Sequence, residues 1–139
     1  MAEELDRLGR RVARRFIARG ERPTAREIAR KMGVQIVERE EPPPAQRGLR
    51  SEYRPDPPLI VLYRGPIERL AARIHIDQRF DMMNCDLPDV HIAHELFHHI
   101  EAGGRFGALD IEQVERAAHA FAQELLGLTF HPAELSHIT

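Results

Sequence analysis

The spacing of apolar residues along the chain predicts five helices. Residues 3–19 place an apolar side chain at every third or fourth position, which is the period of a helix with one buried face. The run Thr24-Ala25-Arg26-Glu27 has the pattern of a capping box, so a second helix is expected to begin there and to end at Gly33. The same spacing predicts helices at residues 66–78, from Pro88 to Gly103, and at residues 111–126.

Three shorter runs predict strands at residues 34–39, 48–54 and 58–63, of which the last is nearly all β-branched or aliphatic. Prolines at 55, 57 and 58 predict a turn between the last two strands, and residues 80–87 are expected to be irregular. The predicted fold is α+β, a compact domain of several helices with a small, mostly antiparallel, three-stranded sheet. The apolar run at 59–63 suits a core strand, and it equally suits an edge strand that holds an extended substrate.

Length and composition narrow the class of protein. A chain of 139 residues with a net charge of −2 predicts one domain, residues 1–139, without the positive surplus that favours nucleic acid or membrane surfaces. No run of about 18 apolar residues is present, and residues 1–19 lack the apolar core of a secretory signal. A single cysteine excludes an internal disulfide. Together these features lead us to expect a cytoplasmic protein.

Residues 27–34 resemble the first half of a helix-turn-helix, in which a second amphipathic helix would enter the major groove of DNA. A strand-like run at 35–38 and three prolines at 42–44 follow instead. Direct binding of nucleic acid is therefore not expected.

The run His94-Glu95-Leu96-Phe97-His98 carries the clearest chemistry in the chain. Positions i and i+4 of a helix lie on one face, so both imidazoles can bind the same cation. This is the H-E-x-x-H pattern of zinc metallopeptidases, in which Glu95 would act as general base on a metal-bound water. The alternative is a helix whose histidines are polar surface groups.

A third protein ligand is needed, with a fourth position open for water or substrate. Glu101 and Gly104 stand where the longer H-E-x-x-H-x-x-G-x-x-H motif has its glycine and its third histidine, which excludes that motif. On the next predicted helix, Glu115 lies at the margin of the apolar stripe and is the better candidate. His119, one turn later, lies near the same margin.

The two motifs together, His94-Glu95-Leu96-x-His98 and Glu115-x-x-Ala118-x-x-Phe121-Ala122-x-Glu124-Leu125-Leu126, resemble the ImmA/IrrE family of small bacterial metallopeptidases over about residues 60–135. The resemblance implies a zincin-like fold of the gluzincin type, with Glu115 as third metal ligand. It also implies a protein substrate, such as a helix-turn-helix transcriptional regulator. His119 stands where the family usually has Asn or Asp, so it is expected to be a partner of a ligand histidine or an extra ligand. Phe97 replaces a small residue and is expected to narrow the site.

Two nitrogen ligands and one oxygen ligand favour Zn²⁺, although Mn²⁺ and Fe²⁺ suit the same ligand types. A non-proteolytic alternative is a metal-binding docking module that controls a transcription regulator. Several other side chains are candidates for lesser roles at the site: His91 and His99 as partners of the ligands or surface groups, His75, His131, His137, Tyr53 or Tyr63 as an oxyanion donor, and Cys85 as a thiolate cap on the metal. The sequence leaves the substrate and the oligomeric state open.

Overall fold

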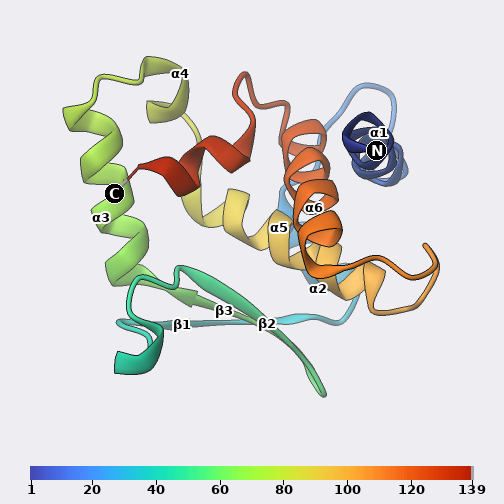
Figure 1. Ribbon diagram of the computed structural model, residues 1–139, viewed down its shortest axis with the longest axis horizontal. Helices are drawn as coiled ribbons and strands as arrows, with labels where there is room; N and C mark the ends of the chain where they lie inside the picture. The colour runs from blue at the N-terminus through green and yellow to red at the C-terminus, as the bar shows by residue number, and fades with distance from the viewer. Residues whose placement is uncertain (139) are drawn as a thin grey trace.

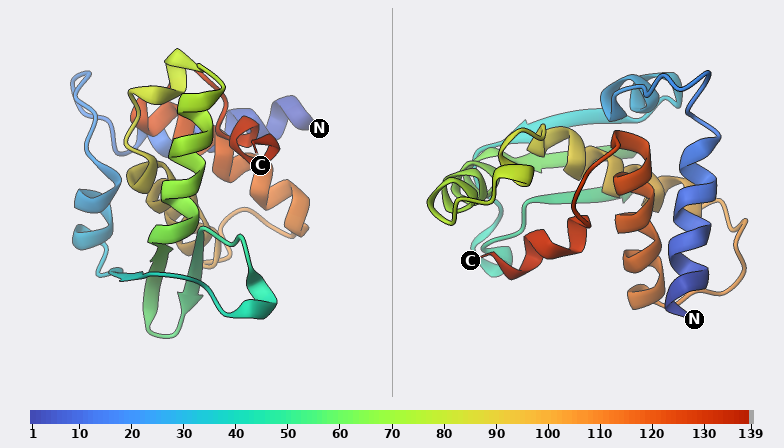
Figure 2. Two further views of the ribbon diagram at one scale, coloured as in Figure 1. Left: turned by 90° about the vertical axis from the view of Figure 1, so that its left-hand side faces the viewer. Right: turned by 90° about the horizontal axis from the view of Figure 1, so that it is seen from above.

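A computed structural model describes residues 1–138 (Figures 1 and 2). Helices precede, interrupt and follow a small sheet, and the α+β class predicted from the sequence is confirmed. The elements are α1 Ala2–Arg14, α2 Ala25–Lys31, β1 Gln35–Arg39, the 3-10 turn η1 Pro44–Gln46, β2 Ser51–Pro55, β3 Pro58–Tyr63, α3 Arg64–Ile76, α4 Phe80–Met83, α5 Leu87–Glu101, α6 Ile111–Leu126 and the 3-10 turn η2 Pro132–His137.

The three strands form one mixed sheet in the order β1-β3-β2. β2 and β3 are antiparallel, with Tyr53 opposite Ile60, but β1 and β3 are parallel, with Ile36 opposite Ile60. The expectation of a mostly antiparallel sheet is therefore wrong for one of its two strand pairs. The reason is that the chain crosses from β1 through η1 and β2 before it enters β3 from the same end.

β3 is the central strand, so the idea that residues 59–63 form a substrate-holding edge is wrong. Four consecutive residues, 60–63, are buried, whereas β1 and β2 each end in two exposed residues, which include Glu38, Arg39 and Arg54. Apolar content on both faces suits a strand that is flanked on both sides, and charged strands suit the edges. β2 is the edge strand that lies beside α5.

The helices pack outward from the sheet in the order α5, α6, α1 (Figure 1). α5 contacts β2 and β3 on one side and α6 on the other, and α1 lies along α6. A side chain at Gly9 of α1 would overlap the carbonyl oxygen of Ala117 and crowd the backbone of Phe121. The glycine, unfavourable in a helix by about 1 kcal/mol, is what lets α1 and α6 approach this closely.

The start of α5 differs in detail from the expectation. Asp86 caps the helix by accepting the amide of Asp89 at 3.1 Å. Asp89 itself is buried and accepts the amides of Ala25 and Arg26, at 2.9 and 3.2 Å, at the beginning of α2. The negative charge of Asp89 therefore lies at the N-terminal ends of both α2 and α5, where it interacts favourably with both helix dipoles. Its hydrogen bonds also join α2 to α5.

Other boundaries also differ from the predictions. α1 ends at Arg14 rather than at residue 19, and residues 80–87 contain the short helix α4. α2 is followed by β1, so residues 24–39 do not form a helix-turn-helix.

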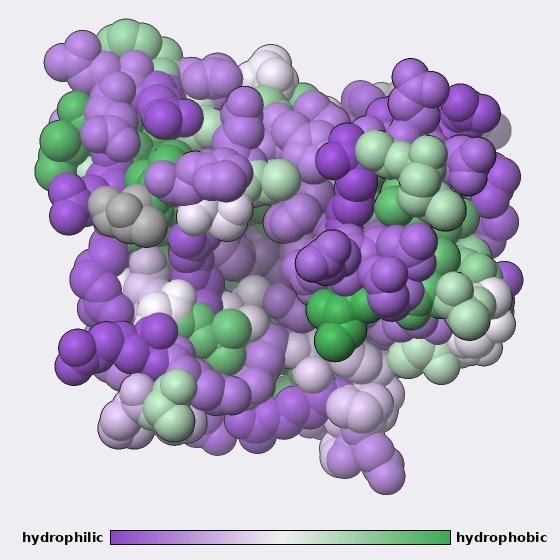
Figure 3. All heavy atoms as spheres, viewed as in Figure 1, coloured by the Kyte–Doolittle hydropathy of each residue, from purple (hydrophilic) through white to green (hydrophobic). Residues whose placement is uncertain are grey.

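No helix among residues 1–138 combines the length and apolar content needed to cross a membrane. Figure 3 shows a mostly hydrophilic face with a hollow between the sheet and the helices.

Candidate metal centre

α5 places His94 and His98 one turn apart on the side that faces α6. Their ring centroids are 5.1 Å apart, and the two Nε2 atoms approach to 3.4 Å. The helix is fixed in register because Ile92, Leu96 and other residues of the opposite side are fully buried. The structure thus brings both histidines of the motif to one point.

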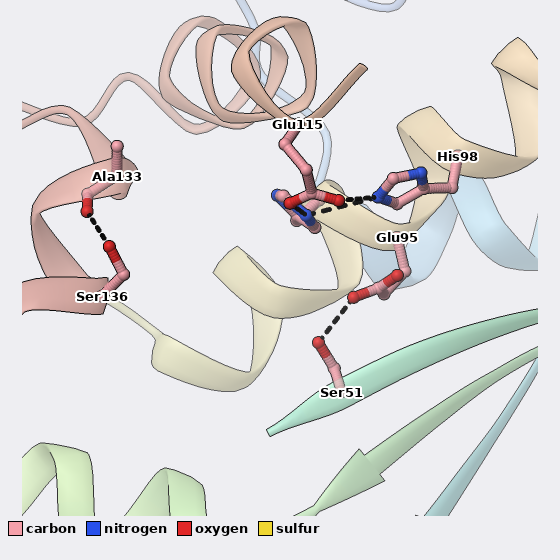
Figure 4. A network of polar contacts seen from close by, with 7 residues as sticks. Ser51, Glu95, His98, Glu115, Ala133 and Ser136 are labelled. Atoms are coloured by element: carbon pink, nitrogen blue, oxygen red, sulfur yellow. Dashed lines mark hydrogen bonds and ion pairs between the residues drawn. The ribbon is translucent and has the colours of Figure 1, made fainter. Parts of the chain in front are cut away.

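Glu115 reaches the same point from the second turn of α6 (Figure 4). Its two carboxylate oxygens lie 2.9 Å from Nε2 of His94 and 2.8 Å from Nε2 of His98. α6 begins with a capping box between Asp110 and Gln113. The sequence analysis did not identify this capping box. This capping box fixes the first turn of the helix, immediately before Glu115.

The charges at this point depend on one another. Burial opposes ionisation of Glu115, but the two imidazoles hold the pKa of its carboxyl well below the usual value. Burial likewise opposes a charge on His98, yet Glu115 raises the pKa of that imidazole above its usual value. In these contacts the N–H at each Nε2 donates a hydrogen bond to the carboxylate, and a bound metal would take the place of those hydrogens.

The three residues fit a metal ion in both number and spacing. Their ligand atoms all lie within 4.8 Å of one another. A tetrahedral zinc ion with bonds of about 2.0–2.1 Å holds its ligands about 3.3 Å apart, close to the 3.4 Å between the two Nε2 atoms. The Glu115 oxygens lie nearer to the imidazoles and would withdraw by about half an ångström to admit such an ion.

Glu95 lies beside this group and is 7% exposed. Its Oε2 accepts a 2.8 Å hydrogen bond from the hydroxyl of Ser51, the first residue of β2 (Figure 4). One step further along, the hydroxyl of Tyr53 lies 2.6 Å from Nδ1 of His99. Two strand residues span about 6.6 Å and four helical residues about 6 Å, so β2 and α5 can be joined at two successive points.

Sequence reasoning missed Ser51. A signal was present, because Ser51 and Tyr53 alternate with the charged Glu52 and Arg54 and therefore share a face of β2. What the sequence lacked was the identity of the element covering that face.

A cleft of about 710 Å³ opens over the motif. One wall is β2 and the residues before it, the floor is α5, and the other wall is formed by α6 and η2. Residues from each of these elements line it, including Arg50, Ser51, His94, Glu95, Glu115 and Leu135.

His119 lies against His94, with ring centroids 4.6 Å apart, but it is not one of the three converging ligands. Its Nδ1 and that of His94 are buried without a hydrogen-bond partner among the described residues. Burial lowers the pKa of His119 to about 3, so the ring is neutral. The structure does not place a hydrogen bond between the two rings, and the role expected for His119 stays a prediction.

Nδ1 of His91 donates to the carbonyl oxygen of Leu87 at 2.7 Å, and burial lowers the pKa of His91 to about 4. His91 lines the cleft one turn before His94. His131 accepts the amide of Ala133 at the start of η2.

The hydroxyl and thiol groups of the remaining candidates are engaged with residues other than the three ligands. Tyr63 donates to Glu52 at 2.7 Å, and the Tyr53 hydroxyl is engaged with His99. Cys85 donates to the carbonyl oxygen of Met82 and lines a different pocket, so it does not cap the three ligands.

The expectation that Phe97 narrows the site is wrong. It is fully buried, and it stacks on Phe106 and packs against Phe121. Helix geometry turns it about 80° away from the midpoint of His94 and His98, which directs the ring into the core rather than into the cleft. His75 and His137 are exposed.

Comparisons of the chain with models of protein families, with curated proteins and with solved structures find no match. The resemblance to the ImmA/IrrE family therefore stays a prediction from the two motifs.

Proposed function

We propose that this protein is a zinc-dependent endopeptidase that hydrolyses a peptide bond in a cytoplasmic protein. The observation that carries the proposal is the convergence of His94, His98 and Glu115 in a cleft that also contains the carboxylate of Glu95. Two imidazoles and a carboxylate, with room for a fourth ligand, form the donor set of many catalytic zinc sites.

His94, His98 and Glu115 would hold the ion. Zinc at such a site acts as a Lewis acid and lowers the pKa of water from 15.7 to about 7. Glu95 would accept the proton of the attacking water and deliver it to the leaving amine. Ser51 supports this role because its hydrogen bond fixes one oxygen of the Glu95 carboxylate.

The edge strand β2 is the proposed support for the substrate. Ser51, Tyr53 and Pro55 line the cleft, and the order β1-β3-β2 leaves the outer edge of β2 for another strand. An extended peptide could pair with that edge and pass over the metal ligands. The resemblance to the ImmA/IrrE family makes a transcriptional regulator of the helix-turn-helix class the proposed substrate.

Metal content tests the proposal most directly. Elemental analysis of protein purified without a histidine tag should give about one zinc per chain in the parent, and little in His98→Ala or Glu115→Ala. His75→Ala is the matched control, since His75 is exposed on α3 and is neither one of the three ligands nor part of the cleft, and it should keep its zinc. A parent that takes up no zinc, even when zinc is supplied, would remove the peptidase assignment.

A further inference from the structure

Arg50 is the one arginine or lysine among the residues that line the cleft. It immediately precedes β2, and it is half-buried under η2. One of its guanidinium nitrogens donates to the carbonyl oxygen of Leu135 at 3.2 Å. A guanidinium has five N–H donors, so this single contact leaves most of them available.

The charge of Arg50 is not balanced within the described chain. No carboxylate of residues 1–138 lies within 4.0 Å of its guanidinium. The neighbouring Arg54 differs, because it is paired with Glu52 at 2.6 Å. A partly buried cation without a partner is costly, and it is usually retained where it binds something.

The surroundings of Arg50 favour an anion. His91 of α5 lines the same cleft and is neutral because burial keeps its pKa at about 4, so it does not compete for a carboxylate. Burial also lowers the pKa of Arg50 itself, which reflects the reduced access of water to the guanidinium. Charge-assisted hydrogen bonds are stronger where water is partly excluded.

Charged side chains of opposite sign are also distributed unevenly along the cleft. Arg50 and His91 lie at one end, and Glu101 lies at the other, ten residues and about 15 Å further along α5. A peptide lying in the cleft would therefore meet a guanidinium at the Arg50 end, and the carboxylates of Glu95, Glu115 and Glu101 further along the cleft.

We propose that Arg50 binds a carboxylate of the substrate, so that the cleft selects peptides with an acidic group at one fixed distance from the cleaved bond. This inference rests on the proposed peptidase function and adds its substrate class. The carboxylate has two sources, an Asp or Glu side chain or the free C-terminus of the peptide. The planar guanidinium suits either, because it can donate two parallel hydrogen bonds to one carboxylate.

The first experiment reads selectivity from cleavage. The zinc-loaded protein is incubated with a peptide pool of randomised sequence, prepared once with free and once with amidated C-termini, and the residues around each cleaved bond are counted. Enrichment of Asp and Glu in both pools identifies a side-chain carboxylate. If cleavage occurs at a fixed distance from the C-terminus, and only in the pool with free C-termini, the bound group is the C-terminal carboxylate. Arg50→Gln should abolish the enrichment, whereas Arg47→Gln, the loss of an exposed arginine nearby, should retain it.

The second experiment needs no catalysis. Glu95→Gln protein, with and without zinc, is applied to an array of peptide pairs that differ only by Glu or Gln at one position, or only by a free or an amidated C-terminus. We expect the acidic member of a pair to bind about 10- to 100-fold more tightly, and the preference to vanish when Arg50→Gln is added. Arg50→Lys should retain part of the preference, which also guards against loss of folding as the cause.

The outcomes separate the two proposals. If peptides are cut without an acidic preference, or if Arg50→Gln leaves the preference unchanged, the role of Arg50 is overturned and the peptidase function stands. If nothing is cut but the array shows an acidic preference that depends on Arg50, the peptidase function fails and the carboxylate site stands. An array without such a preference overturns the inference whether or not zinc binds.

Discussion

Ser51 donates a 2.8 Å hydrogen bond to Glu95, and both side chains are buried. The bond connects the edge strand of the sheet to the helix that carries two of the candidate metal ligands. It engages Oε2 of Glu95 and leaves the other carboxylate oxygen without a protein hydrogen bond among the described residues. The orientation of the proposed general base is therefore set by β2 rather than by α5 alone.

Ser51→Ala should lower kcat by about 10-fold, because the Glu95 carboxylate then loses the bond that holds it in position. KM and zinc content should stay near the parent values, since neither β2 pairing nor the three ligands are changed. Ser51→Thr keeps the hydroxyl and should restore most of kcat. Steady-state kinetics on one peptide decides the matter, and an unchanged kcat in the alanine variant would contradict the positioning role.

Glu95→Gln should slow peptide hydrolysis by about 10² to 10⁴, because the amide cannot accept the proton that a general base must take. Zinc should remain bound, since Glu95 is not one of the three converging ligands. Single-turnover cleavage and metal analysis should be run on the same samples. Glu112→Gln, an exposed change on α6, is the control. Full activity in Glu95→Gln would exclude this residue as the base.

The zinc-free protein should lose stability as the pH falls from 7 to 5, in part through His91. Burial depresses the pKa of His91 to about 4, so below pH 6.5 the unfolded chain binds a proton that the folded chain does not. The cost is about 1 to 2 kcal/mol in the free energy of unfolding. His91→Asn keeps a hydrogen-bond donor for the Leu87 carbonyl but does not titrate. Between pH 7 and pH 5 the free energy of unfolding of this variant should therefore fall by about 1 to 2 kcal/mol less than that of the parent. Urea unfolding at each pH measures it, and parallel curves would refute the assignment.

Asp89→Asn should lower the free energy of unfolding by about 2 kcal/mol, because the buried carboxylate accepts two amides at the start of α2. An amide side chain offers one oxygen and turns an NH₂ group toward a donor. Asp86→Asn is the matched control on the same turn, where Asn caps a helix about as well as Asp. Thermal unfolding measures the loss of stability in both variants. Equal losses would show that the hydrogen bonds from Asp89 to α2 add no measurable stability.

The sequence predicted most elements and the three candidate ligands because those features depend on local spacing. The four-residue interval of His94 and His98 needs only a helix, and the placement of Glu115 needs only the apolar stripe of α6. Strand order is different, since it depends on which edge the chain returns to after β2. The partners of Ser51 and Asp89 lie 44 and 64 residues away, and no local pattern specifies them.

The expected narrowing by Phe97 failed for a related reason. Adjacency to two ligands in sequence says little about adjacency in space, because successive residues of a helix are turned by about 100°. The same rotation that sends Phe97 into the core brings His94 and His98 together.

The connection between α5 and α6 contains Gly104 and Gly107, both with positive φ, and few of its residues are buried. An ion held by His98 and Glu115 would cross-link this segment as a disulfide does, closing a loop of 18 residues from position 98 to position 115. Closing a ring of that size restricts the unfolded chain by about 3 kcal/mol in the loop-entropy model. Zinc supply would then govern how long the protein survives proteolysis, independently of whether it is active.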